Sequence, residues 1–239
     1  METSVSKPGS SLNRNNFIKT GVLTVAGSLI LNMMPGCKEK EENEEGQEVS
    51  PPEDLMQEHG LLNRILLIYD HCRMQLVNKA DFPLMAVSSA AGIIRQFVED
   101  YHEKQEEDYL FPRFKKANQL TDLVNILLQQ HQAGRTLTDQ IIQLSKTATR
   151  SDSEDQQLIQ ALTAFNTMYR PHEAREDTVL FPAFRKIVSS HEYDSLGEEF
   201  EKNEHKHSGH DGFDVMLNKV ANIEKQLGIY ELAQFTPTV

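Results

Sequence analysis

The sequence contains no tryptophan and only two cysteines among its 239 residues. Cys37 and Cys72 lie in segments of different character and form no CxxC pair, which argues against a disulfide framework and against a thiolate zinc site. Acidic residues outnumber basic ones by 36 to 24, which gives a net charge of -12. Because no basic face is available to neutralise phosphates, we expect no nucleic acid partner. The modest glycine and proline content, with 38 % hydrophobic residues, favours a helical domain with a real core.

The apolar run near the N-terminus, residues 21–34, is too short to span a bilayer comfortably. It follows a polar stretch and is typical of a signal-peptide core. The run leads into Gly36-Cys37, and a small residue before a cysteine resembles a bacterial lipoprotein cleavage site. The resemblance implies a signal peptide over residues 1–36 and lipidation of Cys37. It also implies an exported protein, periplasmic or on the cell surface, with a lipid anchor in the membrane; a non-lipidated signal or a short anchor is the alternative.

The export route stays open, because Arg14-Asn15 resembles a twin-arginine motif whose second arginine is replaced. Residues 38–54 hold two lysines, seven glutamates and one aspartate. This composition cannot build a core, so we predict an acidic, disordered tether over residues 37–52. The folded domain is expected to begin near Glu53.

From that point the apolar residues recur at helical spacing. Breaks are predicted near residues 78–83, 116–121 and 147–155, and a capping-box pattern at Ser151–Glu154 predicts a helix start. Four long helices with short links predict an all-α fold, an up-down-up-down four-helix bundle over residues 53–190.

The remaining residues, 191–239, are predicted to form a helical extension packed on the bundle. An amphipathic segment, Phe213–Leu227, precedes Gly228 and predicts an additional C-terminal helix. The histidine-rich stretch from His205 to His210 contains Gly209 and is interpreted as a loop. Its role, loose metal binding or an ordinary surface, stays open.

The strongest feature of the sequence is an internal repeat. The pattern HxxxE followed by LFPxF begins at His102 and again at His172, 70 residues later. A further histidine precedes each copy: His59 precedes the first and His131 the second. Two matching helical hairpins that face each other would form a bundle with pseudo-twofold symmetry.

This repeat has the chemistry of a metal site. Residues i and i+4 share one face of a helix, so each HxxxE unit presents an imidazole and a carboxylate to one point. Four imidazoles and two carboxylates suit a mid-row divalent metal, and glutamates can bridge two ions, as in di-iron carboxylate bundles. The candidate ligands are His59, His102, Glu106, His131, His172 and Glu176.

The two copies, with Gln-His-Gln-Ala-Gly-Arg at residues 130–135 between them, resemble the hemerythrin-like (HHE cation-binding) family over residues 53–188. The resemblance assigns the same six ligands to two iron ions bridged by carboxylates. It implies a non-haem di-iron protein that binds or senses O2 or NO, or handles iron. Oxygen-carrying members have a fifth histidine one turn after the third-helix ligand, where this chain has Arg135.

Arg135 leaves two interpretations open. If it faces the site, a metal position is free for O2, NO, peroxide or water. That favours an enzyme that reduces peroxide, NO or O2 with an electron donor the sequence does not identify. Otherwise Arg135 points to solvent or pairs with a nearby carboxylate. A metal-free scaffold with incidental histidines is a third possibility on sequence alone.

Helical geometry predicts which neighbouring residues lie beside the ligands. Tyr169 lies three residues before His172, shares its face and is expected to support it. Glu107 and Asp177 directly follow the ligand glutamates, so we expect them to point away from the site.

Overall fold

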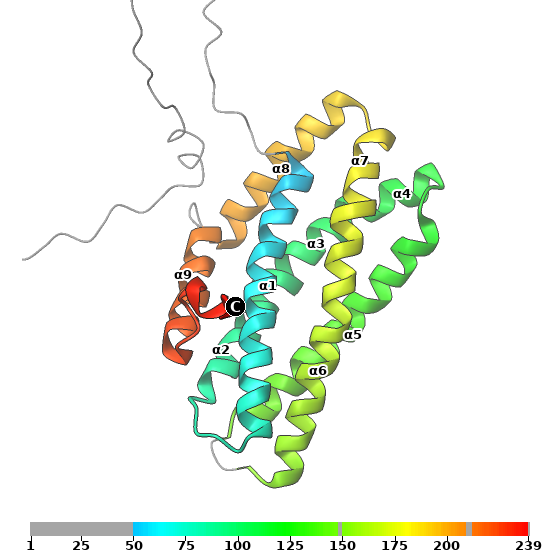
Figure 1. The fold of residues 1–239 in the computed structure, drawn as a ribbon. Coiled ribbons are helices and arrows are strands. Elements are labelled where there is room, and N and C mark those ends of the chain that lie inside the picture. The colour runs from blue at the N-terminus through cyan, green and yellow to red at the C-terminus, as the bar shows by residue number, and fades with distance from the viewer. Residues whose placement is uncertain (1–49, 148–149, 209–211, 239) are drawn as a thin grey trace, which may run out of the picture. The chain divides into compact units, whose positions relative to one another are not determined.

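The computed structural model describes residues 50–147, 150–208 and 212–238, and every regular element in these ranges is a helix. Four antiparallel rods form the predicted bundle (Figure 1). The first is α1 (Pro51–Val77) and the third is α5 (Thr121–Ser145). The second runs through α2 (Met85–Ile93), η2 (Ile94–His102), α3 (Glu103–Gln105), η3 (Glu106–Leu110) and α4 (Phe111–Ala117). The fourth runs through α6 (Asp152–Arg175), η4 (Glu176–Leu180) and α7 (Phe181–Ile187). The all-α prediction is confirmed.

The first helix begins two residues before the expected start. Ser50 caps α1 in a capping box with Glu53, so Pro51 and Pro52 belong to the first turn rather than to the tether. Proline fits there because the first amides of a helix have no intrahelical partner. The predicted Ser151–Glu154 capping box is present and starts α6. The predicted signal peptide, Cys37 and the predicted tether up to residue 49 lie outside the described residues.

The apolar core is divided into two clusters. The larger includes Leu62, Tyr69 and Phe165, and it lies toward the links that join α1 to α2 and α5 to α6. The smaller includes Leu55 and the phenylalanines of both LFPxF motifs. The candidate ligands come from the turns between these clusters, so apolar packing holds the site from both sides.

The C-terminal extension consists of two helices rather than one. Tyr193, Leu196 and Phe200 of α8 (Ser190–Ser208) join the smaller cluster. Phe213 and three further apolar residues of α9 (Gly212–Leu227) join the larger one.

The interpretation of the histidine-rich stretch as a loop is wrong for His205 and His207. Both lie in the last turns of α8, where helical bonding continues to Ser208 before the glycine is reached. His210 lies outside the described residues. Gly228, with φ of +70°, ends α9 as predicted. The short 3-10 turn η5 (Leu232–Phe235) is not buried, and Leu232 is 82 % exposed.

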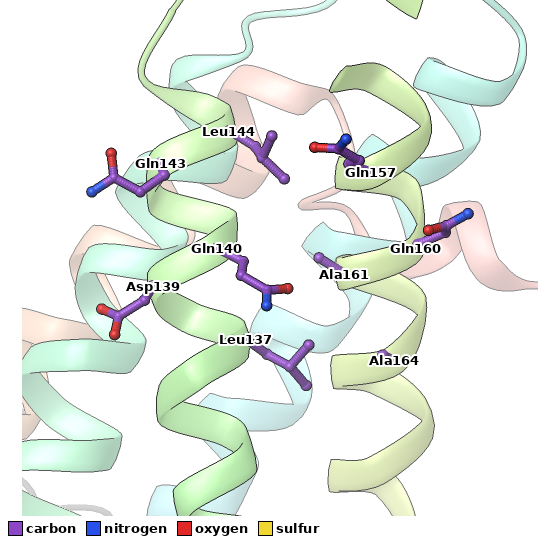
Figure 2. Close-up of a pocket in the computed structure, with 9 residues that line it drawn as sticks. All are labelled: Leu137, Asp139, Gln140, Gln143, Leu144, Gln157, Gln160, Ala161 and Ala164. Carbon is purple, nitrogen blue, oxygen red and sulfur yellow. The ribbon is translucent and has the colours of Figure 1, made fainter. Parts of the chain in front are cut away.

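An open groove of about 690 Å³ lies between α5 and α6 (Figure 2). Ala161 and Ala164 leave space there, and Gln140 points into it from the opposite helix. None of its lining residues is a candidate ligand. No helix in the described ranges has both the length and the apolar character needed to cross a membrane.

Candidate metal centre

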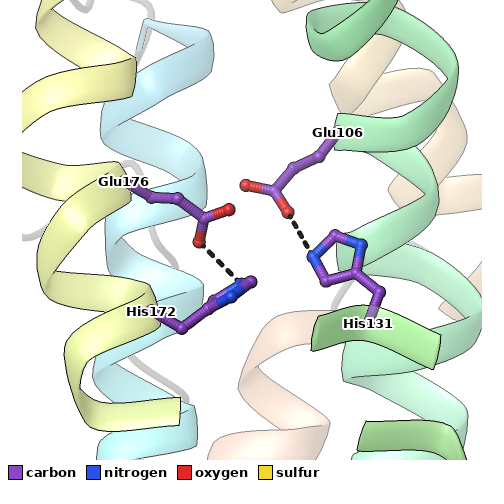
Figure 3. A group of neighbouring side chains, drawn as sticks. All are labelled: Glu106, His131, His172 and Glu176. Carbon is purple, nitrogen blue, oxygen red and sulfur yellow. Dashed lines mark ion pairs between the residues drawn. The ribbon is translucent and has the colours of Figure 1, made fainter. Parts of the chain in front are cut away.

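The structure brings all six candidate ligands together from the four rods of the bundle. His59 comes from α1, His131 from α5, and each HxxxE pair from one of the other two rods. All six are buried, and the two glutamates are fully so. Figure 3 shows Glu106 and Glu176 facing each other across the centre, each beside an imidazole.

The Nε2 atoms of all four histidines face these two carboxylates. Oε2 of Glu106 lies 3.4 Å from Nε2 of His131 and 3.9 Å from Nε2 of His102. Oε2 of Glu176 lies 3.1 Å from Nε2 of His172 and 3.5 Å from Nε2 of His59. The ligand atoms form two overlapping groups whose members lie within 4.8 Å of one another. One holds Glu106, His131, His172 and Glu176, and the other holds His59, His102 and Glu106.

The polar atoms at the centre need a partner that the protein does not supply. Among the described residues, both carboxylate oxygens of Glu106, both of Glu176 and Nε2 of His131 are buried without a hydrogen-bond partner. Leaving such groups unsatisfied is destabilising, and more so when they are charged. A divalent cation would satisfy them all, and this mixture of imidazole and carboxylate suits iron. The residues present therefore fit the metal that the sequence predicts.

Each ligand histidine is oriented through its other ring nitrogen. The Nδ1 atoms lie at hydrogen-bonding distance from acceptor oxygens: His59 to Asp177 at 2.7 Å, His102 to Glu58 at 2.7 Å, His131 to Glu107 at 3.1 Å and His172 to Gln130 at 2.9 Å. An Nδ1–H that donates to such an oxygen leaves Nε2 as the metal-binding atom and fixes the plane of the ring.

Sequence reasoning missed these four partners. The expectation that Glu107 and Asp177 point away from the site is wrong, because each reaches across to the histidine of the opposite hairpin. The signal was present in the repeat. An acidic residue follows each ligand glutamate, and Glu58 and Gln130 precede the two upstream histidines. Extending the repeat by one residue on each side would have found all four.

The LFPxF motif explains the local backbone. Proline has no N–H, and its ring clashes with the carbonyl four residues earlier, which disfavours a regular α-turn. The turn before Pro112 widens instead: Phe111 N–H donates to the carbonyl of Glu106, five residues back. The equivalent bond joins Phe181 to Glu176. Each ligand glutamate therefore begins a π-turn, a distortion that often accompanies functional sites.

The phenylalanines of the motif enclose the centre. Phe111 stacks on His131 with ring centroids 5.5 Å apart, and Phe181 stacks on His59 at the same distance. Each ring thus covers a ligand of the other hairpin. Phe114 and its repeat counterpart Phe184 meet at 6.0 Å. These contacts exclude water on one side of the site and bind the two halves together.

Arg135 does not point to solvent, and it pairs with carboxylates. Its guanidinium lies 2.7 Å from Glu103 and 2.8 Å from Glu107. Glu103 also accepts a hydrogen bond of 2.8 Å from the hydroxyl of Tyr169. The Tyr169 ring meets that of His172 edge-on at 5.5 Å. Burial raises the pKa of Glu103 to about 8, so it binds a proton more readily than an exposed carboxylate.

The two central carboxylates differ in their electrostatics. Burial and the nearby carboxylates Glu176 and Glu103 raise the pKa of Glu106 well above its usual value. Burial acts on Glu176 in the same direction, but His172 and His59 outweigh it and hold the pKa of Glu176 well below its usual value. Burial lowers the pKa of His131 to about 4. For His59 the hydrogen bond to Asp177 and the nearby carboxylate of Glu176 outweigh burial and raise the pKa to about 10.

The chain matches the model of the hemerythrin HHE cation binding domain over residues 50–184. Proteins from Mycobacterium tuberculosis and Mycobacterium bovis, each named only as uncharacterised, are 47 % identical to it over 191 residues. The matched segment covers 80 % of this chain and 75 % of each relative. No solved structure matches the chain. The chain therefore belongs to the hemerythrin HHE cation-binding family, and its buried histidine–glutamate cluster supports metal binding.

Metal affinity is expected to increase with pH between about pH 6 and pH 9. In the metal-free protein His59, with a pKa of about 10, is protonated at neutral pH, and the raised pKa of Glu106 favours its protonated form. A metal ion must displace these protons, so acid competes with it for the same atoms. Calorimetric titration with Fe(II) in buffers of different ionisation enthalpy measures the protons released. Equal affinity at both ends of this pH range would contradict the prediction.

Asp177→Asn should weaken Fe(II) binding by about tenfold or more, the usual loss when the carboxylate that orients a ligand histidine is removed. The side chain keeps its size, so the change acts on the orientation and basicity of His59 rather than on packing. Asp108→Asn makes the same charge change on an exposed side chain and should leave the affinity unaltered. Equal affinities for the two variants would show that Asp177 does not support the metal.

Proposed function

We propose that this chain is a non-haem di-iron protein that binds or senses O2 or NO, or handles iron. The observation that supports this most directly is the convergence of four Nε2 atoms on two buried carboxylates that lack other partners.

The arrangement of the imidazoles supports two iron positions. The ring centroids of His59 and His102 are 4.8 Å apart, and those of His131 and His172 are 5.1 Å apart. Each pair would hold one ion, with Glu106 and Glu176 shared between them. Six protein ligands shared by two ions would leave room at the iron for a small exogenous ligand. Arg135 does not take up that room, because Glu103 and Glu107 hold it.

A second candidate function is an enzyme that reduces peroxide, NO or O2 at the same site. Bound iron supplies one-electron chemistry with such ligands. The buried contact between Tyr169 and Glu103 favours this candidate, because it places an oxidisable phenol and a proton acceptor beside His172.

Rapid mixing of reduced, iron-loaded protein with O2 or NO separates the two candidates. A binding protein should give a spectral change that reverses when the gas is purged. An enzyme should consume its substrate repeatedly when a chemical reductant is supplied. Failure of the protein to bind iron would exclude both.

We also propose that the chain is exported and anchored to a membrane through a lipid on Cys37. The lipoprotein-like pattern of its first residues supports this, and the electron donor of any reduction would then lie outside the cytoplasm. Metabolic labelling with a fatty acid should mark the native chain and the Cys72→Ser variant, but not Cys37→Ser. Cys72 is fully buried and serves as the matched control. Label retained by Cys37→Ser would contradict the assignment.

A further inference from the structure

The two halves of the bundle match at the metal ligands but differ in the layer behind them. Arg135 lies four residues after His131, and the corresponding residue after His59 is Asn63. Arg135 forms an ion pair with Glu103, whereas Asn63 donates a hydrogen bond to Glu173, the repeat counterpart of Glu103. Only the half that holds His131 and His172 therefore places a fixed cation behind the ligands.

Three residues before its second ligand histidine, the same half has a tyrosine where the other half has a glutamate. Tyr169 lies edge-on to His172, and the residue 70 positions earlier is Glu99. Tyr169 is 1 % exposed, and its hydroxyl donates to one oxygen of Glu103 at 2.8 Å. The other oxygen of Glu103 forms an ion pair with the guanidinium of Arg135 at 2.7 Å. The phenol thus lies between the metal centre and a buried carboxylate, whose ionised form is favoured by the ion pair with Arg135 and can take its proton.

A second core tyrosine provides the contrast. Tyr169 stacks on Phe165 at 4.3 Å, and Phe165 meets Tyr69 edge-on at 5.3 Å. The hydroxyl of Tyr69 is buried and has no hydrogen-bond partner within the described part of the chain. A phenol without a proton acceptor is difficult to oxidise, because its radical cation would be left in an apolar environment. Of these two tyrosines, only Tyr169 has both an acceptor and contact with a ligand.

We propose that Tyr169 is a redox-active residue that donates one electron to the metal centre during reduction of hydrogen peroxide, with Glu103 receiving its proton. The inference rests on the proposed di-iron function and assigns a peroxide substrate to its enzymatic form. Peroxide takes one electron from the phenol and one from the metal centre, and with two protons from solvent it becomes two waters. The O–H bond of Tyr169 breaks, and a new O–H bond forms on Glu103.

The test uses the iron-loaded full chain, with its iron content measured first. The protein is mixed with excess hydrogen peroxide, frozen within milliseconds and examined by electron paramagnetic resonance, with ring-deuterated tyrosine to identify a tyrosyl radical. The native chain and the Tyr69→Phe control should both give the radical. Tyr169→Phe should lose it, and Glu103→Gln should form it more slowly or not at all.

The outcomes separate this inference from the function on which it rests. A chain that binds no iron would overturn the proposed function, and this inference with it. A chain that binds iron but gives no radical would overturn only the inference. A radical that persists in Tyr169→Phe would also overturn only the inference, because the electron would then come from another residue. Tyr169→Phe keeps its ring in the stack with Phe165, so loss of the radical with unchanged iron content cannot reflect unfolding.

Discussion

Glu106→Gln and Glu176→Gln should both greatly weaken iron binding, yet move the stability of the metal-free protein in opposite directions. Each variant removes a negatively charged donor from the proposed iron centre. In the metal-free protein, however, the two carboxylates have different neighbours. Glu176 lies beside His172 and His59, which stabilise its ionised form. Glu106 also lies near His131 and His102, but burial and the other carboxylates dominate and destabilise its ionised form.

The signs follow from the pKa of each group in the folded and the unfolded chain. Glu106 has a raised pKa, so burying it opposes folding near neutral pH, and Glu106→Gln should increase the unfolding free energy by about 1 kcal/mol. Glu176 has a lowered pKa, so its ionised form contributes stability at neutral pH. Glu176→Gln should therefore decrease the unfolding free energy by a similar amount. Denaturant unfolding of the chelator-treated proteins at pH 7 provides the measurement. Equal shifts of the same sign would contradict this description of the centre.

Gly134→Ala should disrupt the bundle more than any other glycine-to-alanine change within its described helices. A Cβ at this position would lie 2.8 Å from Cζ of Tyr169 and closer still to its hydroxyl oxygen. The phenol would have to move away from Glu103, or α5 and α6 would have to separate. Overpacking of this kind destabilises by about 1–3 kcal/mol, although alanine is otherwise the better helix former.

Gly92→Ala in α2 is the matched control. An added Cβ there meets no described atom within 4 Å, so the variant should be neutral or more stable by about 0.5–1 kcal/mol. Thermal unfolding of both iron-free variants compares the two changes. If Gly134→Ala were as stable as Gly92→Ala, the close approach of Tyr169 to α5 would not exist in solution.

The repeat allowed most of the fold to be predicted from sequence. Two copies of HxxxE with LFPxF, each preceded by a histidine, define two helical hairpins and a shared centre. Helical periodicity placed the breaks between the rods within a few residues. The two-helix extension was less accessible, because the polar sequence of α8 has few apolar residues and its histidines suggested a loop.

The surroundings of the ligands were harder to predict, for a geometric reason. Reasoning within one helix places Glu107 and Asp177 about 100° away from the ligand direction. That direction points to a neighbouring helix rather than to solvent, and the histidine they orient belongs to the other hairpin. The same limit applies to Arg135, whose partners Glu103 and Glu107 lie on the second rod. Contacts between helices depend on packing, which periodicity alone does not determine.

The most direct test of a two-metal centre is the iron content of the purified chain after anaerobic addition of Fe(II) and removal of unbound metal. We predict two iron ions per chain, removable by a strong chelator, with a melting temperature that falls when they are removed. The reduced protein should also change its optical spectrum on exposure to O2. A chain that retains no iron, with the same melting temperature before and after chelation, would contradict the proposed centre.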